Sequence, residues 1–260
     1  MMMFRRNLLC CLPMARARPA LARPAQAEPA PVQIYAAMTF RPALEHVVAA
    51  YREAGGGAAV AIYAPTPVLI RQLAGGAPAD ILLTGDLAWM DEAARQALVQ
   101  PETRSNLIAN DLVLAAPAGT QTAATITRTF ALDALLNGGR LAMCDPDHDP
   151  AGRYAKQTLQ SLGFWQAVEP HIAIAESSPA AVVLVDHHEV AAAICFVTDL
   201  HGDAQAVAVG TFPSDSHAPI IYPVALANPT RNPLASSALA FLRSAEALKI
   251  FFSFGYTPAI

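Results

Sequence analysis

The chain repeatedly places a helix start directly after an apolar run of strand length. The runs at 32–35 and 58–63 are followed by Thr39 and Thr66, and each threonine opens a stretch with helical periodicity. Pro67 stands just inside the second helix start, where its fixed φ suits a helix and its missing N–H costs nothing. Strands that alternate with helices in this way predict an α/β fold.

Two further helix starts lie in the middle of the chain. Asp149 precedes Pro150 and Ser178 precedes Pro179, so each pairs a capping side chain with a proline in the first turn. The first N–H groups of a helix have no partner within it and carry a partial positive charge. Several helix starts that converge therefore predict a binding site for an anion.

Six more apolar runs of strand length recur, with helical segments between them. They lie at 81–84, 112–116, 141–144, 190–197, 206–211 and 220–227, and residues 234–252 predict one long helix. Continuous apolar runs are typical of strands covered on both faces, as in doubly wound sheets, which bind ligands at the carboxyl ends of their strands. We therefore expect two lobes, each with a doubly wound sheet, and a ligand cleft between them.

Composition excludes several classes of protein. The chain has 260 residues, of which 54% are hydrophobic, enough for a large core. A net charge of −4 gives no basic surface for nucleic acid. The four cysteines include no CxxC pair, which argues against a zinc site of that type. Whether Cys144 and Cys195 form a disulfide stays open.

Residues 1–27 have the features of an export signal. Arg5 and Arg6 precede a short apolar run at 8–12, and Ala25-Gln26-Ala27 is a small-x-small cleavage site. The arginine pair resembles a twin-arginine signal, so the route, Sec or twin-arginine, stays open. A disordered leader is the alternative. No later stretch is long and uncharged enough to span a membrane, and we expect a soluble periplasmic protein.

A series of motifs resembles a known family over residues 32–256. They are GAPAD (76–80), WMD (89–91), NDLVL (110–114), NGGRLA (137–142), DPDH (145–148), PAGRYAK (150–156), TFPSDSH (211–217), YPVA (222–225) and FGY (254–256). In these the chain resembles the periplasmic molybdate-binding proteins of ABC-type importers. The resemblance implies a type II binding-protein fold, with 28–109 plus 222–260 in lobe 1 and 110–221 in lobe 2, which closes on a tetrahedral dianion.

The resemblance also implies a set of ligand-binding residues. The family binds its oxyanion with a hydroxyl after each of the first two strands, two backbone N–H groups of the second lobe and a tyrosine hydroxyl. The matching positions here are Thr39 and Thr66 for the hydroxyls, Ala151 and Ser178 for the N–H groups, and Phe196 for the tyrosine.

Three departures from the family pattern surround this expected site. Phe196 has no hydroxyl to donate, and Asp149 stands where the family usually has an apolar residue. Asp149 is more easily interpreted as a helix cap than as a ligand, because a carboxylate repels an anion. Ser178 adds a hydroxyl that offsets the loss at Phe196. Prolines 65, 67 and 179 stiffen the surrounding loops.

The sequence thus predicts a monomeric solute-binding protein and not an enzyme. We expect molybdate or tungstate as its ligand, an ABC permease in the inner membrane as its partner, and no cofactor, no nucleic acid and no metal other than that of the oxyanion. A repurposed relative that carries a metal or another solute is one alternative, and the sensing domain of a regulator is another. Ser214-Asp215-Ser216-His217 holds triad residue types, but adjacent residues do not form a triad.

Overall fold

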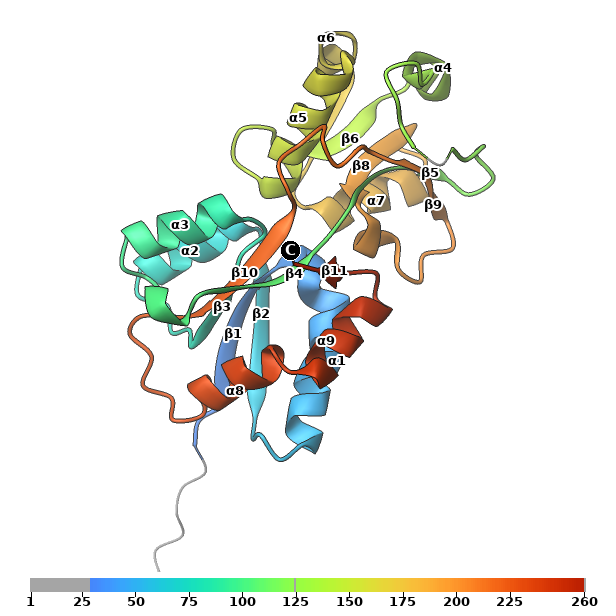
Figure 1. Cartoon of the computed structure of the whole chain (residues 1–260). Helices are drawn as coiled ribbons and strands as arrows, with labels where there is room; N and C mark the ends of the chain where they lie inside the picture. The colour runs from blue at the N-terminus through green and yellow to red at the C-terminus, as the bar shows by residue number, and fades with distance from the viewer. Residues whose placement is uncertain (1–28, 124, 260) are drawn as a thin grey trace, which may run out of the picture.

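The computed structural model describes residues 29–123 and 125–259, so the expected export signal lies outside the described residues. These residues form two α/β lobes, each built on one sheet (Figure 1). The prediction of a two-lobed α/β fold is confirmed. None of the helices described is both long and apolar enough to cross a membrane.

The first lobe contains a six-stranded mixed sheet. In spatial order its strands are β11 (Thr257–Pro258), β4 (Ser105–Ala109), β10 (Ile221–Leu226), β3 (Ile81–Leu83), β1 (Val32–Ala37) and β2 (Ala59–Ala64). Strand β1 is parallel to β2 and β3, whereas β10 is antiparallel to β3 and β4. The sheet is mixed because β10 enters it from the second lobe.

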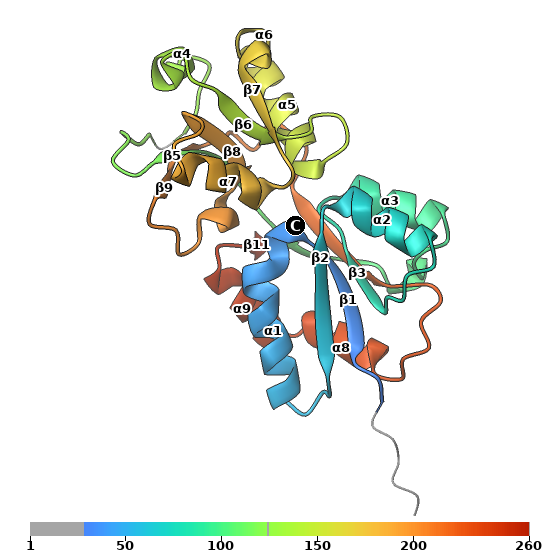
Figure 2. The same cartoon turned by 180° about the vertical axis from the view of Figure 1, so that it is seen from behind.

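Helices cover both faces of this sheet (Figures 1 and 2). One face carries α2 (Thr66–Ala74) and α3 (Leu87–Arg95); the other carries α1 (Arg41–Glu53), α8 (Ala235–Leu242) and α9 (Ala245–Ser253); the short helices η1 (Met38–Phe40) and η2 (Pro101–Thr103) precede α1 and β4. Alternate residues of β1 pack to opposite sides, Tyr35 toward α2 and α3, and Ile34 toward α1. This alternation follows from the period of two in a strand.

The second lobe contains a five-stranded mixed sheet. Its strands, in spatial order, are β7 (Ile172–Ala175), β6 (Leu141–Cys144), β8 (Ala192–Phe196), β5 (Leu112–Pro117) and β9 (Ala206–Thr211). The helices of this lobe are α4 (Leu132–Leu136), α5 (Pro150–Leu162), α6 (Trp165–Val168), η3 (Glu169–His171), α7 (Ser178–Asp186) and η4 (Val197–Leu200). Helix α7 packs on one face of the sheet, and α4 and α5 pack on the other.

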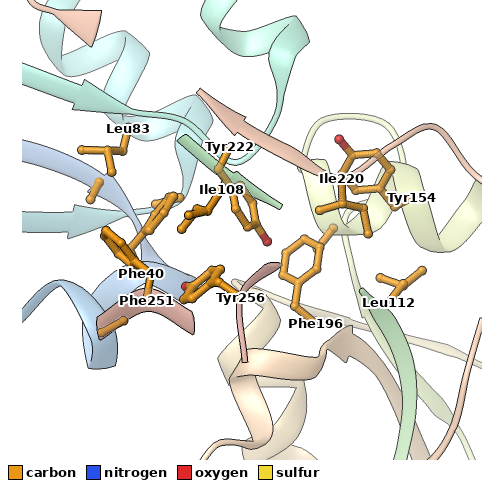
Figure 3. Packing of buried hydrophobic residues seen from close by; sticks show 14 of the residues in the cluster. Phe40, Leu83, Ile108, Leu112, Tyr154, Phe196, Ile220, Tyr222, Phe251 and Tyr256 are labelled. Carbon is orange, nitrogen blue, oxygen red and sulfur yellow. The ribbon is translucent and has the colours of Figure 1, made fainter. Parts of the chain in front are cut away.

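The chain crosses between the two sheets twice, from β4 to β5 and from β9 to β10. A single apolar cluster continues through both lobes at these crossings (Figure 3). Within it, the Tyr222 ring lies 5.0 Å from Phe40 of the first lobe and 5.7 Å from Phe196 of the second, centroid to centroid. We propose that the boundaries between the lobes lie at 109/110 and 221/222.

The prediction of one long C-terminal helix is wrong. The helix ends at Leu242, and α9 begins after Ser244, whose hydroxyl accepts a hydrogen bond from the Ala247 N–H at 3.2 Å. A serine cap starts a new helix in a new direction, while both halves keep the same helical period. The eight strand-like runs all lie on observed strands, whereas β4, β7 and β11 were not predicted.

Candidate functional site

The two threonines expected in the site follow neighbouring parallel strands of the first lobe. Thr39 lies in η1 after β1, and Thr66 is the first residue of α2 after β2; both side chains are buried. Thr39 is thus inside a short helix and does not cap one. The Thr66 hydroxyl accepts a hydrogen bond from the Gly85 N–H at 3.1 Å. Because a hydroxyl has one hydrogen and two lone pairs, Thr66 keeps its hydrogen for a further acceptor.

The second lobe contributes the N-termini of α5 and α7. Asp149 caps α5 as expected, with its carboxylate 2.9 Å from the Ala151 N–H. For α7 the prediction was off by one residue, because Ser177, not Ser178, is the N-cap and accepts from the Ala180 N–H at 3.3 Å. The Ser178 N–H has no hydrogen-bond partner among the described residues. The first turn of α7 therefore offers an unused backbone donor.

These helix starts surround one cavity between the lobes. It is bordered by Ala37, Met38, Thr39, Pro65, Thr66, Gly85, Asp149, Pro150, Ala151, Ser177, Ser178, Pro179 and Phe196. All five residues expected from the sequence are in this set. The cavity has a volume of about 30 Å³. Since a water needs roughly 10–15 Å³ by this measure, the space suits a small ion and not a sugar or a peptide.

Asp199, which the sequence analysis missed, binds several donors of this site. Its carboxylate accepts hydrogen bonds from the Thr39 hydroxyl at 2.7 Å, from the Ser178 hydroxyl and from the Phe196 N–H at 3.0 Å. The available sequence signal was an acidic residue three positions after Phe196, the spacing at which a side chain returns to the start of a helical turn. The contacts to Thr39 and Ser178 join distant segments and leave no local pattern.

Two carboxylates dominate the electrostatics of the site. Burial raises the pKa of Asp199 to about 6, although the bonds from Ser178, Thr39 and Phe196 favour its charged form. Burial also raises the pKa of Asp149 to about 6, against the opposing bond from Ala151. None of the described residues that border the cavity is a lysine or an arginine. Neutral N–H and O–H groups are therefore the donors available to an anion there.

Phe196 borders the cavity and also belongs to the aromatic cluster of Figure 3. Its ring packs edge-on at centroid distances of 5.7 Å from Tyr222 and 6.4 Å from Tyr154. Its backbone N–H is bonded to Asp199 and Ser178. The side chain therefore adds an apolar wall and no hydrogen bond to the site.

The two lobes touch across the cavity. Arg153 of α5 forms an ion pair with Asp86, and the Trp89 indole donates to the His148 carbonyl oxygen at 3.2 Å. A Cβ built on Gly85 would lie only 3.1 Å from the Pro150 ring. The Trp89 side chain is half-buried and bridges the lobes through its bond to the His148 carbonyl oxygen. The structure is thus closed over the cavity.

Ser216 and His217, two of the triad residue types in the sequence, both form other hydrogen bonds. The Ser216 hydroxyl is bonded to Thr158 and to the Pro213 carbonyl oxygen, while the His217 ring lies 2.8 Å from the Ala218 carbonyl oxygen. Over residues 29–123 and 125–259, His, Cys, Asp and Glu form no group of three or more arranged to hold a metal ion. Cys144 and Cys195 are buried and free, which answers the question of their pairing in this structure.

Comparisons with known proteins show the family of this chain. A family model described as bacterial extracellular solute-binding protein matches residues 32–257. The molybdate-binding protein ModA of Escherichia coli (strain K12) is 36% identical over 87% of this chain and 88% of its own length. The molybdate-binding protein ModA of Haemophilus influenzae is 32% identical over 88% of this chain and 90% of its own length. The periplasmic molybdate-binding protein of Azotobacter vinelandii superposes with a TM-score of 0.77, at 19% identity, over 88% of this chain and all of its own.

Proposed function

This chain belongs to the family of bacterial extracellular solute-binding proteins, and we propose that it captures a tetrahedral oxyanion, molybdate or tungstate, for an ABC-type importer. The observation that carries the proposal is the convergence of helix N-termini from both lobes on one small closed cavity. Those of α2, α5 and α7 all border it. Helix N-termini stabilise anions through their free N–H groups and partial positive charge.

In this proposal the oxyanion is held by neutral donors. Thr66 donates its free hydroxyl hydrogen, and Ser178 donates its backbone N–H. Thr39 and Ala151 supply further donors once they leave Asp199 and Asp149. Each hydrogen bond to a charged partner contributes roughly 1.5–3 kcal/mol, so a few such bonds in a closed site are enough for tight binding. Two relatives that are each named as a molybdate-binding protein support molybdate as the ligand.

We place the mature chain in the periplasm as a monomer, delivered there by the signal in residues 1–27 through the Sec or the twin-arginine route. Its partner is an inner-membrane permease that accepts the closed, loaded form. The protein works without a cofactor and carries out no catalysis. Light scattering of the purified chain measures its molar mass and so tests whether it is a monomer.

A cation carrier is the second candidate, because Asp149 and Asp199 bring two carboxylates to one site. Both carboxylates already accept hydrogen bonds from N–H or O–H groups, which a cation would have to displace. A cation would also meet the positive ends of three helices. The geometry therefore favours an anion.

Isothermal titration of the purified mature chain distinguishes the two candidates. The panel contains molybdate, tungstate, sulfate and phosphate on one side, and zinc, manganese and iron salts on the other, with chelator present in the anion titrations. We expect one molybdate or tungstate per chain, with no dependence on a divalent cation. Binding of a metal alone, or no binding of any oxyanion, would contradict the proposal.

A further inference from the structure

The Asp199 carboxylate stands where a bound anion would compete with it. Three donors of the site point to it: the hydroxyls of Thr39 and Ser178 and the N–H of Phe196. They come from three different elements, η1 of the first lobe and α7 and β8 of the second. In this structure an internal carboxylate thus holds the Thr39 hydroxyl, which the proposed function assigns to the ligand, together with the Ser178 hydroxyl at the same cavity.

The hydroxyls of Thr39 and Ser178 have no second hydrogen to donate to an incoming anion. Each hydroxyl has one hydrogen, and both Thr39 and Ser178 give theirs to Asp199. While Asp199 is ionised, the two hydroxyls turn only lone pairs toward the cavity. Lone pairs repel an oxyanion. A protonated Asp199 is itself a donor and accepts fewer hydrogen bonds, so the hydroxyl hydrogens become available to the ligand.

The groups that face Asp199 do not offset its charge. The titratable side chains around it are the carboxylate of Asp149 and four weaker acids, Cys144, Cys195, Tyr222 and Tyr256. The largest influences on its ionisation are burial, the bonds from Ser178, Thr39 and Phe196, and the charge of Asp149, and none of these is a cation. An anion that enters the cavity adds a further negative charge, and therefore favours the neutral form of the carboxyl group.

A purely local role for Asp199 accounts for only one of its contacts. A side chain that bonds the N–H three residues earlier stabilises the turn of η4, and the bond to Phe196 does this. That role does not require Thr39, which lies in the other lobe, or Ser178, which lies at the start of α7. These two bonds place Asp199 at the point where the lobes close on the ligand.

We propose that Asp199 is a positioning residue that couples oxyanion capture to the uptake of one proton: the proton binds its carboxyl group and frees the Thr39 and Ser178 hydroxyls to donate to the ligand. This inference rests on the proposed function. The proton comes from solvent and no covalent bond of the oxyanion changes. Because the pKa of Asp199 is about 6, the free protein is mostly ionised at neutral pH. The dissociation constant then rises about tenfold for each pH unit above that value and levels off below it.

Calorimetry with molybdate at micromolar concentration tests the coupling on the unaltered chain. Titrations at about pH 6 and about pH 8, each in two buffers of different ionisation enthalpy, give the affinity and the number of protons taken up. We expect close to one proton per molybdate at the higher pH and a dissociation constant tens of times larger there than at the lower pH. No binding at either pH would overturn both the proposed function and this inference. Binding with equal affinity at both pH values and no proton uptake would overturn the inference alone.

Two matched variants assign the proton. Asp199→Asn keeps the shape of the side chain and resembles its protonated form, since its amide both donates and accepts. It should bind molybdate more tightly than the parent at about pH 8 and show little pH dependence. Asp149→Asn, at the other carboxylate with a raised pKa, should keep the pH dependence. If the dissociation constant still depends on pH in Asp199→Asn but no longer does so in Asp149→Asn, the proton binds Asp149 and the proposal is wrong. If Asp199→Asn does not fold, the double variant Thr39→Val/Ser178→Ala replaces it, and it should bind without proton uptake.

Discussion

The Thr66 hydroxyl accepts the Gly85 N–H at 3.1 Å, and this bond leaves its own hydrogen free to donate to another group. Thr66 lies on α2, whereas Gly85 lies between β3 and α3. The two segments therefore fix the orientation of a side chain that would otherwise rotate. Thr39, at the equivalent place after β1, is bonded to Asp199 instead. The two threonines that the sequence treats alike are thus in different hydrogen-bonding states.

Removal of the Thr66 hydroxyl should weaken oxyanion binding strongly. Thr66→Ala and the isosteric Thr66→Val lose a bond to a charged ligand, which corresponds to roughly 1.5–3 kcal/mol, or about 10- to 100-fold in the dissociation constant. At a pH below the pKa of Asp199, Thr39→Ala should raise the dissociation constant by a similar factor. Thr→Ser at either position should raise it less. Calorimetry with molybdate measures each value. If both alanine variants bind like the parent, the threonines only start helices.

Gly85 should control how closely the lobes approach. A Cβ at this position would lie 3.1 Å from the Pro150 ring and 3.2 Å from the Thr66 hydroxyl oxygen. Gly85→Ala should therefore hold the lobes slightly apart and weaken binding, with little change in the melting temperature of the free protein. Gly75→Ala is the matched control, because a Cβ there meets only helix carbonyls at 3.4 Å and lies away from the cavity. Equal affinities for the two variants would contradict this account of closure.

The regular elements could be predicted where local patterns determine them. Eight strands follow from apolar runs, and Asp149 follows from a cap that precedes a proline. The break between α8 and α9 was missed because the apolar period continues across Ser244. Strand β4 was missed because it begins with two polar residues, Ser105 and Asn106, and β7 because its apolar residues at 172–175 form a short run directly after the polar segment at 169–171.

The site was predictable only in part, for a similar physical reason. Its five expected residues each sit at the start of a helical segment or the end of a strand, positions that the chain marks locally. The role of Asp199 depends on Thr39, which is 160 residues away in the sequence. The ion pair of Asp86 with Arg153 spans 67 residues in the same way. Such contacts form only when the two lobes are placed together.

Phe196→Tyr tests whether position 196 faces the ligand. If an oxyanion oxygen lacks a donor, the new hydroxyl should tighten binding roughly tenfold, the effect of one bond to a charged group. If Ser178 already supplies that donor, the hydroxyl has nothing to satisfy and crowds the ligand. The coupling energy of Phe196→Tyr with Ser178→Ala separates these cases. No change in affinity for any oxyanion in either single variant would show that the second-lobe assignment is wrong.

The stability of the free protein should fall as the pH rises from about 4 to about 6. The folded pKa of Asp199, about 6, lies above the value of about 3.9 for an unfolded chain, so the folded state binds more protons in that window. The loss is about 3 kcal/mol for a buried carboxyl group with this difference. In urea unfolding, Asp199→Asn should remove that part of the pH dependence of stability between about pH 4 and about pH 6. An unchanged slope would show that Asp199 titrates alike in both states.

The cavity between the N-termini of α2, α5 and α7 should bind a tetrahedral oxyanion. Crystals of the protein grown with tungstate, measured at the tungsten absorption edge, locate the heavy atom without assumptions about the ligand. We expect one strong anomalous peak in this cavity, with ligand oxygens about 2.7–3.2 Å from the Thr66 hydroxyl and the Ser178 N–H. A cavity without a peak, or a peak only elsewhere, as in the groove beside Asp80 and Arg231, would contradict it.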